Sequence, residues 1–138
     1  MVSSDTIEFE TQGDGEIVDL TARVQEAVRR SGIRHGLTTV CAVGSTAAIS
    51  TIEYEPGLAQ DWPELMRRLI PEEASCHHDK TWGDGNGYAH LRSTLVGTTF
   101  TTAVSEGKMT LGTWQQIVFL EFDNRPRDRE VRVQVMGE

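Results

Sequence analysis

Within the first third of the chain, the spacing of hydrophobic residues changes from every second residue to every third or fourth residue. Residues 5–13, DTIEFETQG, alternate apolar and polar side chains, which predicts a half-buried strand that ends at a glycine. Residues 19–32, DLTARVQEAVRRSG, place apolar side chains at helical spacing, with Asp19 as the expected N-cap and Gly32 as the stop. The chain is therefore expected to begin with a strand followed by a helix.

A segment rich in β-branched residues comes next, and a second helix follows it. Residues 37–57 are interrupted by Gly44, which predicts either two strands or one kinked strand, ended by a turn at Pro56-Gly57. Residues 61–71, DWPELMRRLIP, then predict a helix that is capped by Asp61 and terminated by its last proline.

The last part of the chain turns from a short helix to extended segments. Residues 88–97, YAHLRSTLVG, predict a helix that closes at a glycine. The apolar run at 116–122 and the alternating residues at 130–136 predict strands, with turns at 106–107 and 124–126. Three consecutive strands joined by short turns indicate a mainly antiparallel sheet.

Helices set among strands without regular alternation indicate the α+β class. A length of 138 residues is enough to bury an independent core. We therefore expect a single domain over residues 1–138, in which two to three helices pack on a mainly antiparallel or mixed β-sheet.

Charge and cysteine content narrow the possible partners and the compartment. The formal net charge of -8 argues against nucleic-acid binding, because affinity for phosphate backbones comes largely from clustered Lys and Arg. Cys41 and Cys76 are too few for a disulfide framework, and no signal-like leader is seen, so a reduced cytoplasmic protein is expected. No apolar run approaches the roughly 20 residues that span a bilayer, so no membrane role is expected.

The segment SCHHDKTWGDGNGYAHLRS, residues 75–93, contains the first candidate site. His78 and His90 flank a turn-forming loop that can bring their imidazoles together, and imidazole binds zinc and other divalent ions. Asn86, Asp79 or Asp84 could add oxygen ligands. The alternative is that both histidines are surface or hydrogen-bonded structural residues. The glycines of this loop also suit an anion at a helix start, or form a plain turn.

Three other segments could contribute to a site. Ser45 and Thr46 could donate hydrogen bonds to phosphate, and Glu53 could act as a base, although a strand with a solvated acidic face explains the same pattern. The sequence DNRPRDR concentrates arginines that can bind phosphate or form surface ion pairs. Trp114 and Gln115 could supply an aromatic wall and an amide, although a Trp at a strand start is usually a core residue.

The order of these motifs resembles the YjbQ-like family. The resemblance rests on GSTAAISTIEYEPG, HHDKTWGDGNGYAHLRSTLVG and LGTWQQIVFLEFDNRPRDREVRV, and it runs from about residue 40 to the C-terminus. The motif residues of the family fall on His78, Asn86, Ala89, His90, Leu111 to Gln115, Pro126, Arg127 and Arg129.

Two departures from the family pattern bear on the site. Many relatives have a histidine before the hydroxyl pair, whereas this chain has Gly44, so one metal ligand is lost if that histidine binds metal. Glu53, Asn86, Cys76 or water would then be needed to complete the metal shell. Arg125 is an apparent insertion before the last motif, which would enlarge the anion patch.

The resemblance implies a function, a cofactor and an assembly. The family is described as a secondary thiamine-phosphate synthase family, which implies joining of a hydroxymethylpyrimidine pyrophosphate to a thiazole phosphate. It also implies a homotrimer and a pocket near the subunit contacts that binds a divalent metal, zinc or magnesium, and a small phosphorylated metabolite.

On this basis we assign expected roles to the motif residues. His78 and His90 are the expected metal ligands, and Glu53 and His90 the expected catalytic groups. The expected anion-binding and substrate-binding residues are Ser45, Thr46, Asn86, Trp114, Gln115, Arg127 and Arg129. The alternatives are a metal-assisted hydrolase of a small phosphorylated metabolite and a non-catalytic trimer that binds a metal or small ligand.

Overall fold

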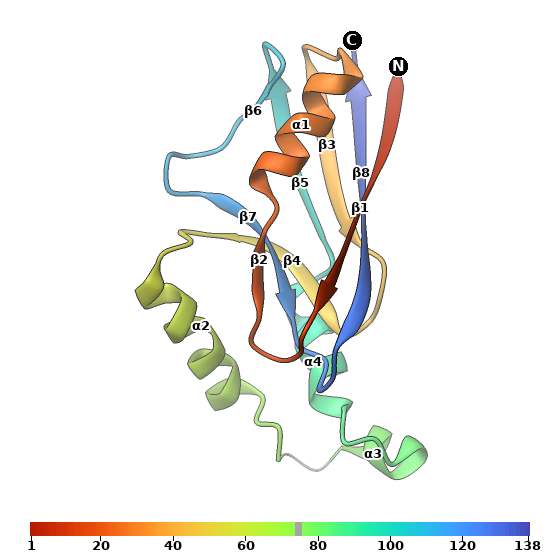
Figure 1. Ribbon diagram of the computed structural model, residues 1–138, viewed down its shortest axis with the longest axis vertical. Coiled ribbons are helices and arrows are strands. Elements are labelled where there is room, and N and C mark those ends of the chain that lie inside the picture. Colours follow the sequence, from red (N-terminus) through yellow and green to blue (C-terminus); the bar gives the residue numbers. More distant parts are fainter. Residues whose placement is uncertain (74–75) are drawn as a thin grey trace.

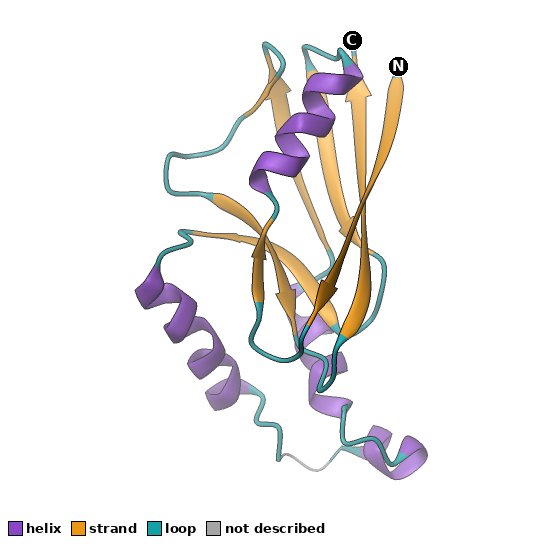
Figure 2. Ribbon diagram, in the orientation of Figure 1, coloured by secondary structure: helices purple, strands orange, loops and turns teal. Residues whose placement is uncertain are grey.

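The strands of the protein form two antiparallel sheets in this computed structural model, which describes residues 1–73 and 76–138 (Figures 1 and 2). The large sheet has five strands, in the order β1 (Val2–Thr11), β8 (Arg127–Gly137), β3 (Gly36–Ala42), β5 (Thr99–Ser105) and β6 (Lys108–Met109). The small sheet has three, in the order β2 (Ile17–Asp19), β7 (Gln116–Glu121) and β4 (Ala47–Ile52). The described helices are α1 (Thr21–Ser31), α2 (Pro56–Leu69), α3 (His77–Trp82) and α4 (Gly87–Val96).

The small sheet lies between two cores. Along β7, Ile117 and Phe119 face the first core, which is formed with α1 and the inner face of the large sheet. Val118 and Leu120 face the second core, which Met66 of α2 and residues of α4 complete. A strand that is buried on both faces reads as a continuous apolar run, which is why this segment lacks alternation in the sequence.

Two glycines allow β3 and β8 of the large sheet to approach each other closely. Gly36 of β3 pairs with Gly137 of β8. A Cβ atom on Gly36 would lie only 1.9 Å from the Met136 carbonyl oxygen, so no larger residue fits there. This contact aligns β3 with β8 near the chain termini, which lie side by side in Figure 1.

The strand pairs are antiparallel as expected, but they form two sheets, and consecutive strands belong to different sheets. β5 and β6 form the expected hairpin, with Glu106 and Gly107 at positive φ values of 53° and 77° in the turn. β7, however, pairs with β2 and β4, whereas β8 pairs with β1 and β3. The two strands expected on either side of Gly44 are confirmed, and they too lie in separate sheets.

Two helix starts were predicted wrongly. α2 begins at Pro56 and not at Asp61, because the carboxylate of Glu55 accepts hydrogen bonds from the first backbone N–H groups and proline suits the first helical position. The N-cap of α1 is Leu20, although Asp19 still accepts a 2.9 Å hydrogen bond from the Thr21 N–H.

The helix ends were predicted more accurately than the starts. Gly32 and Gly97 close α1 and α4 as expected. The two to three expected helices become four within the described residues, because α3 was read as part of a loop. None of the described helices has the length and hydrophobicity needed to cross a membrane.

Candidate functional site

The candidate site is formed by two short helices, α3 and α4. His78 comes from α3 and His90 from α4, and their ring centroids lie 4.5 Å apart at an interplanar angle of 46°. The connecting loop reverses direction through Gly83 and Gly85, whose φ angles of 66° and 63° suit glycine. The structure therefore brings together the two imidazoles that the sequence singled out.

Two carboxylates face the ring of His78. Its Nδ1 atom lies 3.7 Å from Asp79 Oδ1 and 3.5 Å from Asp84 Oδ1. The Gly87 N–H donates a 2.9 Å hydrogen bond to the same Asp79 oxygen. The Asn86 N–H donates a 3.2 Å hydrogen bond to Asp84 Oδ1. Both carboxylates are therefore oriented by the backbone at the start of α4.

The spacing of these three atoms fits a metal ion. Nδ1 of His78 is buried and has no hydrogen-bond partner within the described residues. The distances to the two carboxylates exceed the roughly 2.7–3.2 Å of an N–H···O bond. They resemble instead the separation of roughly 3.4 Å between ligands of a tetrahedral ion with bonds near 2.1 Å. An imidazole and two carboxylates are ligands that zinc accepts.

His90 does not join this group. The ligand atoms of His78, Asp79 and Asp84 lie within 4.8 Å of one another, and no atom of His90 belongs to that set. Of the expected pair of metal ligands, only His78 belongs to this group of converging atoms. The ring of His90 packs against the ring of His78, and His90 lines a cavity.

A cavity of about 320 Å³ lies beside His90. The cavity is lined by residues just before β4, by residues of α4 and by the residues that follow α4. Three hydroxyl-bearing residues, Ser45, Thr94 and Thr98, line it, whereas the hydroxyl of Ser93 donates a hydrogen bond to the Ala47 carbonyl. Hydroxyl donors next to a histidine suit an oxygen-rich ligand such as a phosphate.

Thr46 and Arg127, expected to bind anions, are bound to a carboxylate of the chain itself. The Thr46 hydroxyl and the Arg127 Nε atom each donate a 2.9 Å hydrogen bond to Asp123 Oδ2. Asp123 is fully buried, which raises its pKa, but these hydrogen bonds outweigh burial and hold the pKa below its usual value. Asp123 is therefore ionised and engages the Thr46 hydroxyl and the Nε–H group of Arg127.

Arg129 is also committed within the protein. Its Nε atom donates a 2.8 Å hydrogen bond to Glu121 Oε1, and its Nη2 atom bonds Glu121 Oε2 and the Thr46 hydroxyl. Of the guanidinium nitrogens of Arg129, only Nη1 makes no hydrogen bond among the described residues. It lies next to Gly44, where a Cβ atom would be 3.2 Å from it. The guanidinium forms a buried ion pair instead of the expected phosphate clamp.

Asn86 has a structural role in the described fold. Its side chain is buried, and its Oδ1 atom accepts a 3.2 Å hydrogen bond from the Asn124 N–H. The side-chain amide of Asn124 in turn donates a 2.9 Å hydrogen bond to the Asp84 carbonyl. These bonds fix the loop that carries Asp84 to the β7–β8 turn.

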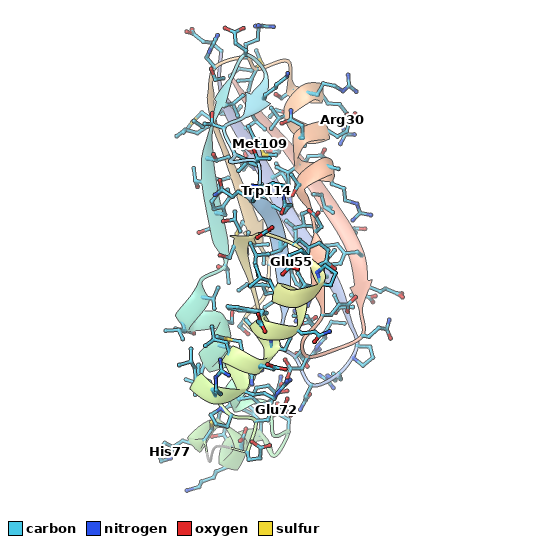
Figure 3. All side chains as sticks on the ribbon, turned by 90° about the vertical axis from the view of Figure 1, so that its left-hand side faces the viewer. Arg30, Glu55, Glu72, His77, Met109 and Trp114 are labelled. Atoms are coloured by element: carbon cyan, nitrogen blue, oxygen red, sulfur yellow. The ribbon has the colours of Figure 1, made fainter. Side chains whose placement is uncertain are left out.

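Glu53, Trp114 and Gln115 lie at the opposite end of the small sheet. Ala47 pairs with Glu121 at one end of the β4–β7 ladder and Ile52 with Gln116 at the other, a separation of roughly 17 Å for five residues. The Gln115 amide reaches the Thr51 hydroxyl at 3.3 Å, and Trp114 is exposed. Figure 3 shows Trp114 far from His77 along the long axis. Within one chain, Glu53 is too distant to act as a base beside His90.

Sequence reasoning missed the buried charges that organise this region. Glu121 is 1% exposed although it interrupts the apolar run of β7, and Arg92 is 1% exposed on α4. A charge inside an otherwise apolar run is the sequence signal that could have identified Glu121, because a buried charge requires a partner. Arg92 sits in a helix with mixed polarity and gives no comparable signal.

The fold and site define a class of protein: a two-sheet α+β domain with a histidine–carboxylate cluster on a helical hairpin beside a hydroxyl-lined cavity. The chain belongs to the family described as UPF0047 protein YjbQ-like, whose model matches residues 5–138. The expected family is therefore confirmed.

Individual relatives agree with this assignment. A UPF0047 protein of Methanothermobacter thermautotrophicus is 40% identical over 122 residues, which cover 88% of this chain and 83% of that protein. The UPF0047 protein YugU of Bacillus subtilis is 32% identical over 133 residues, covering 96% of this chain and 98% of that protein. The crystal structure of a YbjQ-like protein from Sulfolobus solfataricus superposes with a TM-score of 0.89 and 31% identity over 100% of both chains. The α+β fold is thereby confirmed.

Proposed function

We propose that this protein is a metal-dependent enzyme that acts on a small phosphorylated metabolite. The observation that supports the proposal most is the buried, unpartnered Nδ1 atom of His78, which faces Asp79 and Asp84 at ligand-to-ligand distances. The mixed nitrogen and oxygen set favours zinc over magnesium, which prefers oxygen ligands alone.

Residues of the cavity would bind the substrate next to this cluster. Ser45 and Thr98 donate hydrogen bonds to phosphate oxygens, and His90 holds or transfers a proton at the reacting group. A bound divalent cation supplies positive charge that stabilises negative charge on a departing phosphate oxygen.

The finer proposal, suggested by the family resemblance, is synthesis of thiamine phosphate. A hydroxymethylpyrimidine pyrophosphate would lose pyrophosphate as its methylene carbon forms a bond to the nitrogen of a thiazole phosphate. Trp82, exposed at the end of α3, offers an aromatic surface for the pyrimidine near the cluster. The names of the relatives described above state no activity, so this step rests on resemblance.

The size of the cavity favours a second candidate, a metal-assisted phosphate hydrolase. A space of about 320 Å³ is at the lower end of the roughly 300–1,000 Å³ range of ligand pockets, and it suits one small substrate better than two. Hydrolysis needs only one organic substrate and water. This candidate predicts release of phosphate without a second organic substrate.

The metal proposal is tested by element analysis of the untagged protein and of two matched variants. His78→Ala should lower the bound zinc at least roughly tenfold, because it removes a ligand. His77→Ala should keep wild-type zinc content, since that imidazole is exposed on the same helix and lies outside the cluster. Equal zinc in wild type and His78→Ala would refute the site.

A panel assay separates the candidate functions. Thiamine phosphate formation that is lost in His90→Ala supports the synthase. Release of phosphate from single substrates, lost in the same variant, supports the hydrolase. Stoichiometric binding of metal or small ligand with no turnover of any phosphorylated compound would refute the enzyme proposal and leave a binding protein.

We further propose that the protein assembles as a homotrimer through the outer face of the large sheet. No described helix covers this face, and Leu37, Met136 and Val2 form an exposed apolar row across β3, β8 and β1. The hydroxyls of Thr39 and Thr101 continue the uncharged surface on β3 and β5. In a cyclic trimer, this face of one copy would contact a different surface of the next copy, which would cover its exposed apolar row.

Light scattering at micromolar concentration tests the assembly. The wild type should have three times the 15.3 kDa chain mass. Met136→Lys should shift it toward the monomer, whereas Leu65→Lys, which replaces an exposed apolar residue of α2, should not. A monomeric wild type would refute the trimer.

A further inference from the structure

A second pocket, separate from the His90 cavity, is formed by four segments that are distant in sequence. It has a volume of about 380 Å³ and lies between the β1–β2 loop, the residues after α2, the first turn of α4 and the β7–β8 turn. Asp14, Glu16, Glu72 and Tyr88 are among its lining residues, and none of its lining residues lines the other cavity. Glu72 is labelled in Figure 3 below α2.

Arg92 lies under this pocket without offering it a free donor. The residue is 1% exposed. Its Nη1 atom donates to both Asp14 oxygens at 3.0 and 3.2 Å, and its Nε and Nη2 atoms donate to the Ile70 carbonyl at 3.1 and 2.8 Å. The guanidinium also stacks 4.7 Å from the centre of the Tyr88 ring. Because its guanidinium group already contacts other groups of the chain on each side, Arg92 does not make the pocket a phosphate-binding site.

Tyr88 places an unused hydroxyl at the pocket. The residue is 3% exposed, and its hydroxyl makes no hydrogen bond within the described residues. The hydroxyl oxygen is not among the buried side-chain atoms that lack a partner in the described residues, so it is accessible at the pocket surface, where a ligand can take the place of water. Burial first, and then the nearby Asp14 carboxyl, raise the pKa of the phenol well above its usual value, so it remains neutral.

Asp14 and Glu72 both line this pocket, and their carboxyl groups lie close to each other. Burial and this neighbouring carboxyl raise the pKa of Asp14 to about 7, against the opposing effect of Arg92. Asp14 is thus surrounded by Glu72 from the segment after α2, by Arg92 and Tyr88 from α4, and by Glu16 on its own loop. Glu16 is already engaged, since it accepts a 2.7 Å hydrogen bond from the Gln12 N–H.

We propose that this pocket binds a small molecule through a protonated primary amine. An ammonium group has three N–H donors, and Asp14, Glu72 and the Tyr88 oxygen are three acceptors around one space. A metal ion fits less well, because the only set of converging histidine, cysteine and carboxylate ligands among the described residues is the one at His78.

Calorimetric titration with ethylamine, at neutral pH, tests the proposal. We expect saturable binding that is weakened at least roughly tenfold by Tyr88→Phe and by Glu72→Gln, because each removes an acceptor of a charge-assisted bond. Glu73→Gln is the matched control, since it removes an adjacent exposed carboxylate that does not line the pocket. Tetramethylammonium, which has the charge but no N–H donor, should bind at least roughly tenfold more weakly than ethylamine.

The outcomes distinguish this site from the metal site. Ethylamine binding that persists in His78→Ala supports an independent amine site. Absence of saturable ethylamine binding, equal binding of tetramethylammonium, or no effect of both pocket variants would overturn the proposal. Tight binding of magnesium or calcium that depends on Glu72 would overturn it as well, in favour of a metal ligand. Glu72 is exposed, so its variant should fold even if Tyr88→Phe does not.

Discussion

Gly87 is the residue at which packing and the candidate metal site are most directly coupled. It is the first residue of α4, it is buried, and its N–H donates to the Asp79 carboxylate. A Cβ atom at this position would lie 2.7 Å from Cys76 Cβ and 3.0 Å from Asp79 Oδ1. Gly87→Ala therefore pushes the start of α3, with His78 and Asp79, away from α4.

The magnitude follows from the size of this overlap. Carbon atoms in contact are separated by about 3.5–4.0 Å, so the two helices must move apart by roughly 1 Å. Overpacking of this kind costs about 1–3 kcal/mol, and weakening the charged hydrogen bond to Asp79 costs about as much. The better helix propensity of alanine returns at most about 1 kcal/mol, so the net effect is destabilising. Zinc affinity should fall roughly 10- to 100-fold, because a partner that orients a ligand is displaced.

Competition for zinc with a chromophoric chelator, together with urea denaturation, measures both effects. Gly112→Ala is the matched control, since its Cβ atom would have no neighbour closer than 3.7 Å and it lies outside the site. Unchanged zinc affinity in a folded Gly87→Ala protein would refute the idea that this contact positions the ligands.

Three further predictions concern stability. The free energy of unfolding should fall as pH rises from about 4 to about 7, with a slope of up to about 1.4 kcal/mol per pH unit, because Asp14 loses its proton at lower pH in the unfolded chain than in the folded protein. In urea titrations, Glu72→Gln should flatten this slope. An unchanged slope in that variant would contradict the interaction between the two carboxyl groups. Gly36→Ala should cost about 3 kcal/mol or more in urea denaturation, because its Cβ atom would lie 1.9 Å from a carbonyl oxygen of β8, and wild-type stability would disprove that close approach. Glu121→Gln should cost about 3–5 kcal/mol by leaving the buried Arg129 without its counter-charge, and a loss below about 1 kcal/mol would show that the pair is not buried in solution.

Much of the fold could be predicted wherever the information is local. The alternation of residues 130–136 corresponds to β8, and the glycines at 32 and 97 end α1 and α4 as expected. The start of α2 was missed because Glu55 caps the helix from outside the apolar pattern, and Pro56-Gly57 resembles a turn when it is read alone.

The residues of the candidate site likewise divide into those that the local sequence identifies and those that it does not. His78, Asp79, Asp84 and His90 lie within one short segment, so the sequence could identify them as a group. Arg129 looked like a phosphate ligand, because nothing in its local sequence shows that Glu121 lies against it. Glu53 could not be placed either, since its distance from His90 depends on the direction of the whole β4 strand.

The sequence by itself determined the element types, the closing glycines and the histidine–aspartate cluster, because backbone preference and short loops act over a few residues. Only the tertiary structure decided that the strands divide into two sheets, that Glu121 neutralises Arg129, and that Asp14 meets Arg92 from 78 positions away in the chain. These features depend on which distant surfaces can be buried together and on the need of each buried charge for a partner, and a local pattern contains neither.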